Sequence, residues 1–286
     1  MPQDLENIRR AGRLGALKRY QLYGNPGTAQ GRRLGGLRSQ ERFRQDPETW
    51  RQRGLCLRKR IMKPQLSGSL AEFIGIMLGD GGIRSRWQAT ISFNGRDDRA
   101  HAAWICRLVQ DLFSIAPAYS LGKQMSTANL VVSSVALVEF LVSCGVPRGH
   151  KIRNGVAIPA WILESPSYRN ACVRGLMDTD GSVYAHRYRV NGVEYRYPKL
   201  CFSSASPPLM NDVSRILGDE GYRFRIRRDG LCLYLEGQHD VDRYFSEIGT
   251  HNPRYRQRYE TFKASRGRTL FGEVPEMADR NRLLSD

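Results

Sequence analysis

Two acidic motifs 100 residues apart constrain this chain more than any other feature. FIGIMLGDG covers residues 73–81 and VRGLMDTDG covers residues 173–181, and each ends an apolar, helix-like stretch with an acid and a glycine. The same order of signals follows each motif, namely a hairpin, a helix, a second hairpin and a third helix. The sequence therefore predicts an α+β fold of two αββαββα repeats, related by pseudo-twofold symmetry within one chain.

The elements of the two repeats are predicted from apolar periodicity and turn signals. The apolar helices that carry the motifs span 70–78 and 171–177. The first repeat continues with a hairpin, a helix, a hairpin and a helix at 82–94, 97–114, 118–134 and 134–144. The same elements of the second repeat fall at 182–204, 207–220, 222–236 and 238–248. Asn191-Gly192 and Asp229-Gly230 favour tight turns in the two later hairpins.

Alternation along the strands predicts sheets with one apolar and one basic face. The apolar face of the first hairpin has Trp87, Ala89, Ile91 and Phe93. Its other face carries Arg84, Arg86, Gln88, Thr90 and Ser92. In the second repeat the alternation is between Arg223, Arg225, Arg227 and Tyr222, Phe224, Ile226. Because arginine binds both phosphates and guanine edges, we expect the basic faces to contact nucleic acid.

Charge points to the same class of partner. The chain has 45 Lys plus Arg against 28 Asp plus Glu, a formal net charge of +17, and such an excess favours a polyanionic partner. Residues 1–65 alone hold 16 basic and 5 acidic residues, with a basic echo at 13–18 and 33–38. We expect short basic helices broken by glycine, forming an arm that contacts DNA phosphates through Arg13, Lys18, Arg33 and Arg38. The alternative is a solvated basic extension.

The placement of the two motif acids suggests a bound cation. Asp80 and Asp180 each follow the end of a helix, where the helix dipole disfavours a carboxylate. Each helix also has small residues four positions apart, which would let the two helices pack closely and bring the acids together. Oxygen ligands from carboxylates and backbone carbonyls suit Mg²⁺.

The motifs resemble those of the LAGLIDADG homing endonucleases, in the single-chain form with two motifs. The resemblance covers about residues 69–262. The second motif matches the family pattern at Gly175, Leu176, Asp178, Asp180 and Gly181. The first has Leu78 in place of the first acid and Gly79 in place of the following alanine, but it keeps Asp80 and Gly81. The segments GVPRGHKIRN and IGTHNPRYRQR resemble the family's stretches after each repeat's last helix, from which a basic residue reaches the active site.

The resemblance implies a saddle of antiparallel sheets in the DNA major groove and a double-strand break with short 3′ overhangs. It implies two or more Mg²⁺ ions, shared between the motifs and held by Asp80, Asp180 and the carbonyls of Gly79 and Thr179. The candidate basic catalytic residues are Lys151, Arg254 and Arg256. The expected DNA contacts are Arg84, Arg86, Gln88, Thr90, Arg187, Arg189, Lys199, Arg223, Arg225 and Arg227.

We interpret the chain as a monomeric, Mg²⁺-dependent, site-specific DNA endonuclease. Two alternatives stay open: an intron maturase that binds its host RNA, and a regulator that binds DNA without cutting it. The presence of both acids argues against the regulator. The chain starts at Met1 without a Cys or Ser and ends in Leu284-Ser285-Asp286 rather than His-Asn, so a typical intein is not expected.

The expected organisation has five parts. They are a basic N-terminal extension at 1–66, a first repeat at 67–150, a linker at 151–168, a second repeat at 169–265 and a tail at 266–286. No apolar run approaches the roughly 18 residues of a membrane helix, and the N-terminus lacks a hydrophobic signal segment. A cytoplasmic, nucleoid-associated protein without a membrane partner is therefore expected. The six cysteines are scattered without a CxxC pair, so neither a zinc site nor a disulfide framework is expected.

Overall fold

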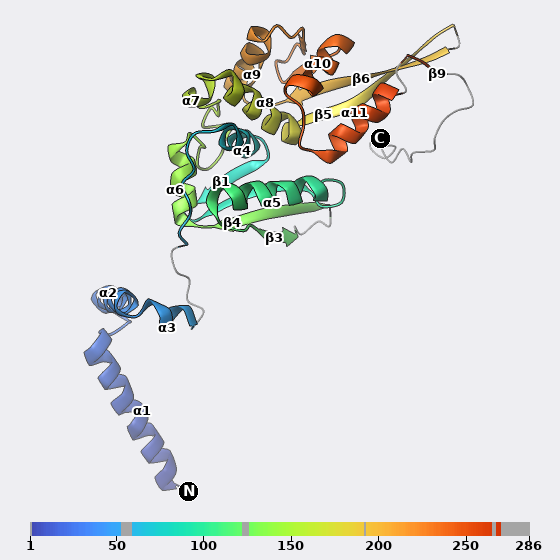
Figure 1. Ribbon diagram of the computed structural model, residues 1–286. Helices are drawn as coiled ribbons and strands as arrows, with labels where there is room; N and C mark the ends of the chain where they lie inside the picture. The colour runs from blue at the N-terminus through green and yellow to red at the C-terminus, as the bar shows by residue number, and fades with distance from the viewer. Residues whose placement is uncertain (1, 53–58, 122–125, 192, 265–266, 270–286) are drawn as a thin grey trace. The chain divides into compact units, whose positions relative to one another are not determined.

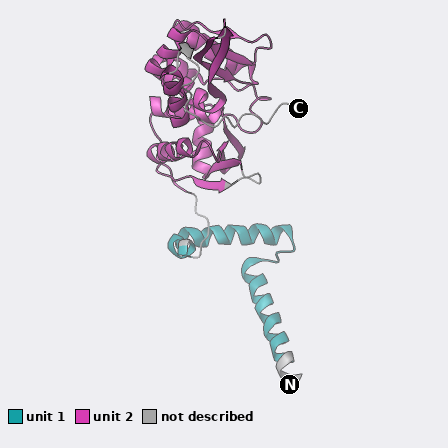
Figure 2. Ribbon diagram, turned by 90° about the vertical axis from the view of Figure 1, so that its right-hand side faces the viewer, with its two compact units in different colours: residues 1–58 teal, residues 59–286 magenta. Residues whose placement is uncertain are grey.

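The computed structural model of the 286-residue chain describes residues 2–52, 59–121, 126–191, 193–264 and 267–269. The chain divides into two compact units, Met1–Arg58 and Lys59–Asp286, which Figure 2 shows in separate colours. The expected tail at 266–286 lies outside the described residues, except for a short strand, β9 (Gly267–Thr269).

The second unit repeats one order of elements twice (Figure 1). The first half contains α4 (Gly68–Leu78), β1 (Gly81–Ser85), β2 (Gln88–Asn94), α5 (Arg99–Phe113), β3 (Ala118–Leu121), β4 (Thr127–Ser133) and α6 (Val135–Ser143). The second half contains α8 (Pro166–Asp180), β5 (Gly181–Val190), β6 (Val193–Ser203), α9 (Pro207–Asp219), β7 (Arg225–Ile226), β8 (Cys232–Leu235) and α10 (Gln238–Glu247). The predicted pair of αββαββα repeats is confirmed.

Two further helices lie outside the repeat pattern. The short α7 (Ala160–Leu163) falls in the connection between the halves, and α11 (Pro253–Ala264) follows the second half. The strand order is β1-β2-β4-β3 in the first sheet and β5-β6-β8-β7 in the second, where β9 also pairs with β6. All of these strand pairs are antiparallel. Each motif helix therefore leads directly into the first strand of its own sheet.

The predicted alternation in the first hairpin is correct except at its turn. Ala89 and Ile91 are buried, and Phe93 packs partly buried against the core. Trp87, which we placed on the apolar face, is 53% exposed because residues 86 and 87 form the turn between β1 and β2. A turn residue no longer follows the period of two that sets the faces of a strand.

The predicted turn in the long β5–β6 hairpin agrees with the backbone. Asn191 has a φ of 50°, in the left-handed region that asparagine tolerates. Val190 pairs directly with Val193, so the chain reverses over two residues. Gly192, the second residue of the expected turn, lies outside the described residues.

The first unit consists of three helices, α1 (Pro2–Tyr23), α2 (Ala29–Gln45) and α3 (Pro47–Gln52). Its predicted helical character is confirmed, but the expectation that glycines break the helices is wrong. Gly12 and Gly15 lie inside α1, and Gly35 lies inside α2. A glycine inside a helix costs only about 1 kcal/mol relative to alanine, which the neighbouring helix formers offset. Thr28 caps the start of α2, since its side chain accepts a hydrogen bond from the Gly31 amide.

The boundary between the units falls at Arg58, before the expected one at residue 66. Residues 59–66 belong to the second unit and form hydrogen bonds to distant parts of it. The Met62 amide donates to the Phe113 carbonyl at 3.0 Å. The Tyr168 hydroxyl donates to the Leu66 carbonyl at 3.0 Å. These bonds join residues far apart in the sequence, so charge and composition could not reveal them.

Two further observations concern membrane spans and cysteines. Within the described ranges, no helix has the length and apolar character needed to cross a bilayer. The cysteines at 106, 144, 172, 201 and 232 are free, and Cys56 lies outside the described residues.

Candidate functional site

The two motif helices, α4 and α8, pack against each other through glycine. A Cβ atom on Gly75 would overlap the backbone carbonyl of Cys172, and one on Gly175 would overlap that of Glu72. Only residues without a side chain permit this approach. At the end of α4, a Cβ atom on Gly79 would overlap Thr179 Oγ1 and lie 3.5 Å from Asp180 Oδ2. The ends of the two motifs therefore meet, as the small-residue spacing predicts.

The two motif acids sit in an environment that opposes their charge. Burial raises the pKa of Asp80 to about 6, with Lys151 opposing the rise and Asp98 adding to it. Burial and the charge of Asp80 raise the pKa of Asp180 to about 7, and Lys151 again opposes the rise. A cation between the two carboxylates would favour their charged forms. Such a pair is therefore poised to bind one.

Lys151 reaches the end of the first motif from the segment after α6. Its Nζ donates to the Leu78 carbonyl at 2.9 Å and also to the Gly79 carbonyl. The ammonium group thus occupies one oxygen expected to bind Mg²⁺. Burial lowers the pKa of Lys151, while Asp180 and Asp80 oppose this change. Lys151 therefore lies within electrostatic range of both acids.

The second repeat places a different residue at the position that corresponds to Lys151. A left-handed glycine ends the last helix of each half: Gly145 has a φ of 101° and Gly249 a φ of 75°. Lys151 stands six residues after the first glycine, and Tyr255 stands six residues after the second. The Tyr255 hydroxyl donates to the Gly181 carbonyl, beside the second motif. Sequence reasoning missed Tyr255, although its distance from the glycine could have revealed it.

The two arginines proposed for the second repeat have other partners. Arg254 Nη2 lies 3.0 Å from Asp98 Oδ1, and Arg254 Nη1 lies 3.9 Å from Asp97 Oδ2. Arg256 is exposed, and its Nη2 donates to the Thr250 carbonyl at 3.0 Å. Asp97 and Asp98 belong to the first half, so Arg254 joins the two halves rather than pairing with Asp180.

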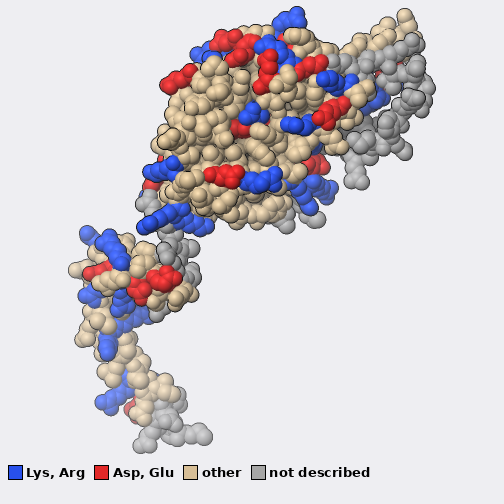
Figure 3. Space-filling view, viewed as in Figure 1, with Lys and Arg blue, Asp and Glu red and all other residues tan. Residues whose placement is uncertain are grey.

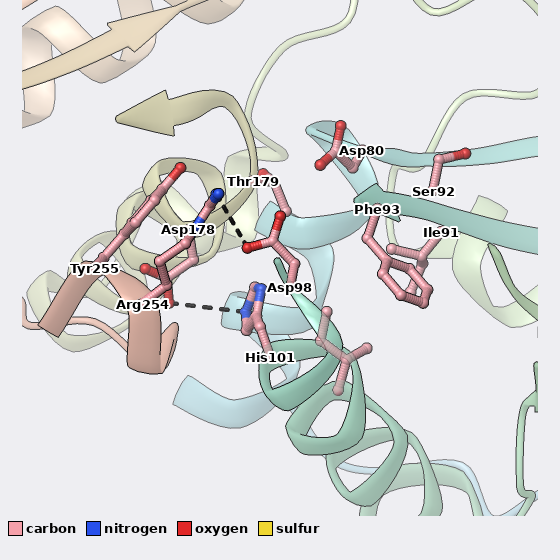
Figure 4. Close-up of a pocket in the computed structure, with 11 residues that line it drawn as sticks. Asp80, Ile91, Ser92, Phe93, Asp98, His101, Asp178, Thr179, Arg254 and Tyr255 are labelled. Atoms are coloured by element: carbon pink, nitrogen blue, oxygen red, sulfur yellow. Dashed lines mark ion pairs between the residues drawn. The ribbon is translucent and has the colours of Figure 1, made fainter. Parts of the chain in front are cut away.

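A small cavity is lined by Asp80 and by residues of both halves (Figure 4). Asp80, Asp98 and His101 line it from the first half, and Thr179 and Arg254 line it from the second. The His101 Nε2 atom is buried and has no hydrogen-bond partner among the described residues. Burial lowers the pKa of His101 to about 4, so the ring is neutral at physiological pH. Asp98 and His101 are site neighbours that the sequence did not reveal.

Asp178, the first acid of the second motif, supports the structure instead of facing solvent. It accepts hydrogen bonds from the Thr250 hydroxyl, from the His251 amide at 2.7 Å and from the Asn252 amide at 3.1 Å. Burial raises the pKa of Asp178 to about 7. At the corresponding position of the first motif stands Leu78, which is buried in the core. Because the first motif has Leu78 where the second has Asp178, it lacks the buried acid that accepts these hydrogen bonds, but it keeps Asp80.

A buried acid on α4 also binds the two halves together. Glu72 is 2% exposed. It pairs with Arg174 of α8 at 2.7 Å and with His251 Nδ1 at 2.6 Å. Although burial opposes it, the bonds from His251 and Arg174 lower the pKa of Glu72. His251 in turn stacks on Trp104 of α5 at 4.3 Å. This network spans the joint between the motif helices.

The DNA-contact candidates of the first sheet lie on its open face or at its turn. Gly82 pairs with Thr90, and the buried Ile83 pairs with the buried Ala89. Thr90 therefore faces away from the core, together with Arg84 and Gln88. Arg86 lies in the exposed turn between β1 and β2.

The candidates of the second sheet divide between its two faces. Lys199 pairs with Tyr184 on the open face, and Arg225 joins them by pairing with Tyr234. Arg187 and Arg189 have the parity of the buried Val183, opposite to that of Tyr184, but both are exposed at the far end of β5. Their contact with DNA stays a prediction. Their position along β5 escaped sequence reasoning because the exposed end of the strand has no apolar alternation.

Each of the three arginines at 223, 225 and 227 pairs with an acid. Arg223 Nε lies 3.4 Å from Asp240 Oδ2, and Arg227 Nη2 lies 2.6 Å from Asp229 Oδ2. Glu236 lies 3.0 Å from Arg225 and 3.1 Å from Lys199. Figure 3 shows acidic and basic side chains side by side over the upper part of the second unit.

The residues at the motif ends fit a divalent cation with oxygen ligands. Two carboxylates with raised pKa values lie beside a cluster of backbone carbonyls, and one of those carbonyls already binds an ammonium group. Across the described ranges, no group of three or more His, Cys, Asp or Glu side chains is placed to hold a metal ion. Any metal would therefore depend on Asp80, Asp180 and backbone oxygens, a donor set that suits Mg²⁺.

Curated proteins with similar sequences have names that do not mention a nuclease. The chain is 29% identical over 228 residues to the tRNA-splicing ligase RtcB of Pyrococcus abyssi, covering 72% of this chain and 24% of that protein. It is 25% identical over 210 residues to the ligase of the same name from Methanopyrus kandleri, covering 64% and 20%. It is 29% identical over 135 residues to that of Pyrococcus furiosus, covering 41% and 13%. The chain thus spans no more than about a quarter of these relatives.

Solved structures with a similar arrangement include a homing endonuclease and a meganuclease. A structure of mesophilic variants of I-DmoI is 18% identical, with a TM-score of 0.44 over 64% of this chain and 95% of that one. A structure of the meganuclease I-SmaMI bound to uncleavable DNA is 9% identical, with a TM-score of 0.47 over 71% and 89%.

The family comparison concerns the half of the chain with the better-matching motif. Residues 167–249 match the family model of the LAGLIDADG-like domain. This range starts within α8, contains the whole second sheet except β9, and ends at the left-handed Gly249. The second half of the chain is therefore similar to a LAGLIDADG-like domain, which agrees with the resemblance seen in its acidic motif at 173–181.

Proposed function

We propose that this chain is a site-specific DNA endonuclease that hydrolyses one phosphodiester on each strand and leaves short 3′ overhangs. The observation that carries the proposal is the meeting of Asp80 and Asp180, one from each half, at the ends of the packed helices α4 and α8. Because one chain supplies both acids, a monomer would suffice. The ligase activity of the curated relatives is not proposed, since this chain covers only a small part of each.

The residues of the site have separable tasks in this proposal. Asp80 and Asp180, with the carbonyls of Gly79 and Thr179, would hold Mg²⁺. When bound, the metal supplies an activated water and charge stabilisation of the leaving oxygen. Lys151 carries a mobile proton beside both acids. The Glu72–Arg174 pair and the Arg254–Asp98 pair hold the two halves, and so the two acids, in register.

A cleavage-site selection tests the proposal. The full-length protein is incubated with a randomised duplex library and Mg²⁺, and the ends of cut molecules are sequenced. We expect one long, partly asymmetric site cut on both strands with a short 3′ overhang. Selective binding to DNA without any cut would favour the regulator. Selective binding to structured RNA with no cut in duplex DNA would favour the maturase.

The first prediction concerns the asymmetry of the basic residues. Replacing Lys151 by methionine should slow cleavage by about a hundredfold, since it removes a proton carrier next to both acids. Tyr255→Phe should slow cleavage by about fivefold at most, since it removes one hydrogen bond worth about 1 kcal/mol. The measurement is the rate of nicked and linear product formation from a supercoiled plasmid. Equal losses in the two variants would show that Tyr255 does more than hold the Gly181 carbonyl.

The second prediction concerns the basic unit at Met1–Arg58, which we propose contacts DNA phosphates beyond the sheets. Arg13, Lys18 and Arg33 are exposed on α1 and α2, while Arg38 is half-buried. Removing residues 1–58 should weaken binding and flatten its salt dependence. Each lost phosphate contact changes the slope of log K against log salt by about 0.9. The structure sets the cut at residue 58 because Met62 and Leu66 bond to the second unit.

The salt titration is run with both proteins on the same duplex. The truncated protein should keep Mg²⁺-dependent cleavage, because both acids and Lys151 remain. An unchanged slope would show that this unit makes no phosphate contacts.

A further inference from the structure

The open face of the second sheet carries a group of tyrosines that the nuclease site does not use. We call it the tyrosine face and define it by Tyr184, Tyr188, Tyr195 and Tyr197. Tyr188 pairs directly with Tyr195 across β5 and β6. Tyr184 pairs with Lys199 in the same ladder. These residues have the opposite parity to the buried Val183, Leu200 and Phe202, so they point away from the core.

Three of the four rings of the tyrosine face stack, with Tyr188 between Tyr195 and Tyr197 in the contacts. Tyr188 lies 5.4 Å from Tyr195 at an interplanar angle of 14°, and 5.9 Å from Tyr197 at 13°. Tyr188 is nevertheless 41% exposed. Because the ring faces are turned to each other, a ligand meets mainly ring edges and phenol hydroxyls. Such a surface offers little ring face for stacking an unpaired base, but it can contact the edges of paired bases.

The charged groups around the tyrosine face are few and carry a small positive excess. Its neighbouring cations, Lys199 and Arg225, both pair with Glu236, and they lower the pKa of Glu236 to about 2. On the opposite face of the hairpin, Arg189 and Arg196 pair with Glu194. On the tyrosine face two cations thus share one acid, and Arg268 of β9 pairs directly with Tyr195 in the strand ladder. The tyrosine rings and hydroxyls themselves carry no charge, so their own contacts would not depend on phosphate charge.

The first sheet has a different chemical character. Its open face carries Thr90, Ser92 and Asn129, and Ser92 Oγ donates to Asn129 Oδ1 at 2.8 Å. Arg84 is exposed beside them, and no ion pair of Arg84 is seen within the described residues. The two halves of the chain thus offer small hydrogen-bonding groups on one sheet and aromatic edges on the other.

The tyrosine face is continuous with the proposed cleavage site. β5 begins at Gly181, directly after Asp180. A strand rises about 3.3 Å per residue, close to the rise of about 3.4 Å per base pair in B-DNA. If the strand follows the groove outward from Asp180, Tyr184 lies about four base pairs from the cut and Tyr188 lies about eight base pairs from it.

We propose that the tyrosine face reads one half of the DNA target through uncharged contacts, with ring edges against thymine methyl groups and hydroxyls against base-edge acceptors. The major groove presents both groups. The proposal rests on the proposed nuclease function and adds which half-site chemistry is read, by which residues and at what distance from the cut.

The test compares Tyr188→Ala and Tyr188→Phe with wild type on the duplex recovered by the cleavage-site selection. Tyr188→Ala should weaken binding about tenfold and relax base preference at one or two positions about eight base pairs from one cut. Its slope of log K against log salt should equal that of wild type, whereas Arg84→Gln should change the slope by about 0.9. Tyr188→Phe keeps the ring stack and should retain most of the affinity.

A matched control and a modified duplex sharpen the result. Tyr119 is 50% exposed and pairs with the buried Leu130, so it lies off the open faces, and Tyr119→Ala should bind like wild type. Replacing a preferred thymine with deoxyuridine removes one methyl group and should cost wild type about fourfold. The same replacement should cost Tyr188→Ala nothing. If Tyr188→Ala fails to fold, wild type and Tyr188→Phe with the deoxyuridine duplex still decide the matter.

Three outcomes would overturn the inference. If Tyr188→Ala cuts the target with unchanged base preference, the tyrosine face does not read DNA, and the nuclease function stands. If Tyr188→Ala weakens binding to a single-stranded oligonucleotide more than to the duplex, the rings stack on unpaired bases instead. If wild type neither binds nor cuts any duplex selectively, both the inference and the nuclease proposal fail.

Discussion

Replacing Asp80 and Asp180 together by asparagine should abolish double-strand cleavage while leaving duplex binding within about tenfold of wild type. The two carboxylates meet at the ends of the motif helices, and burial holds their pKa values at about 6 and about 7. Asparagine keeps the shape but removes the charge that attracts a divalent cation. Metal ions contribute several kcal/mol to such reactions, so the expected loss is at least about a thousandfold.

The measurement is single-turnover cleavage of the selected duplex with Mg²⁺, alongside a binding titration with Ca²⁺. A matched control, Asp111→Asn with Asp219→Asn, removes two exposed carboxylates and changes the net charge equally. This control should cut at the wild-type rate. Each single motif variant should retain residual nicking of one strand. Full cleavage by the Asp80→Asn, Asp180→Asn variant would falsify the assignment of these acids.

Replacing Gly75 by valine should destabilise the second unit by about 3 kcal/mol, the upper range for overpacking a tight interior. Any side chain at this position overlaps the Cys172 carbonyl in α8. The helices must separate, which also strains the Glu72–Arg174 pair between them. For a unit of this size, the expected fall in Tm is about 6–12 °C. Thermal unfolding followed by circular dichroism measures it.

Gly82 provides the matched control, because a Cβ atom there meets nothing within 4 Å. Gly82→Ala should unfold within about 2 °C of wild type, since its stability change is expected within about 0.5 kcal/mol. Gly175→Val should behave like Gly75→Val, because its side chain would overlap the Glu72 carbonyl. If Gly75→Val unfolds like Gly82→Ala, the motif helices are not in close contact.

Local patterns were enough to predict the order of elements. Apolar periodicity located α4 and α8, and turn residues located the reversal at Asn191. The predictions were weaker where a local pattern stops. Trp87 falls in a turn, and Arg187 lies on the strand end where alternation ceases. Gly12 and Gly15 remain inside a helix, because one glycine costs too little to end it.

The sequence by itself determined that two copies of one unit carry an acid at the end of a glycine-bearing helix, because helix and strand periods and capping signals act over a few residues. Only the tertiary structure decided which groups surround those acids. Lys151 bonds to the Leu78 carbonyl, and Arg254 pairs with Asp98. Tyr255 takes the place that Lys151 has in the first half. These partners are separated by tens to more than a hundred residues, and burial and geometry, not sequence distance, select one counter-ion among many.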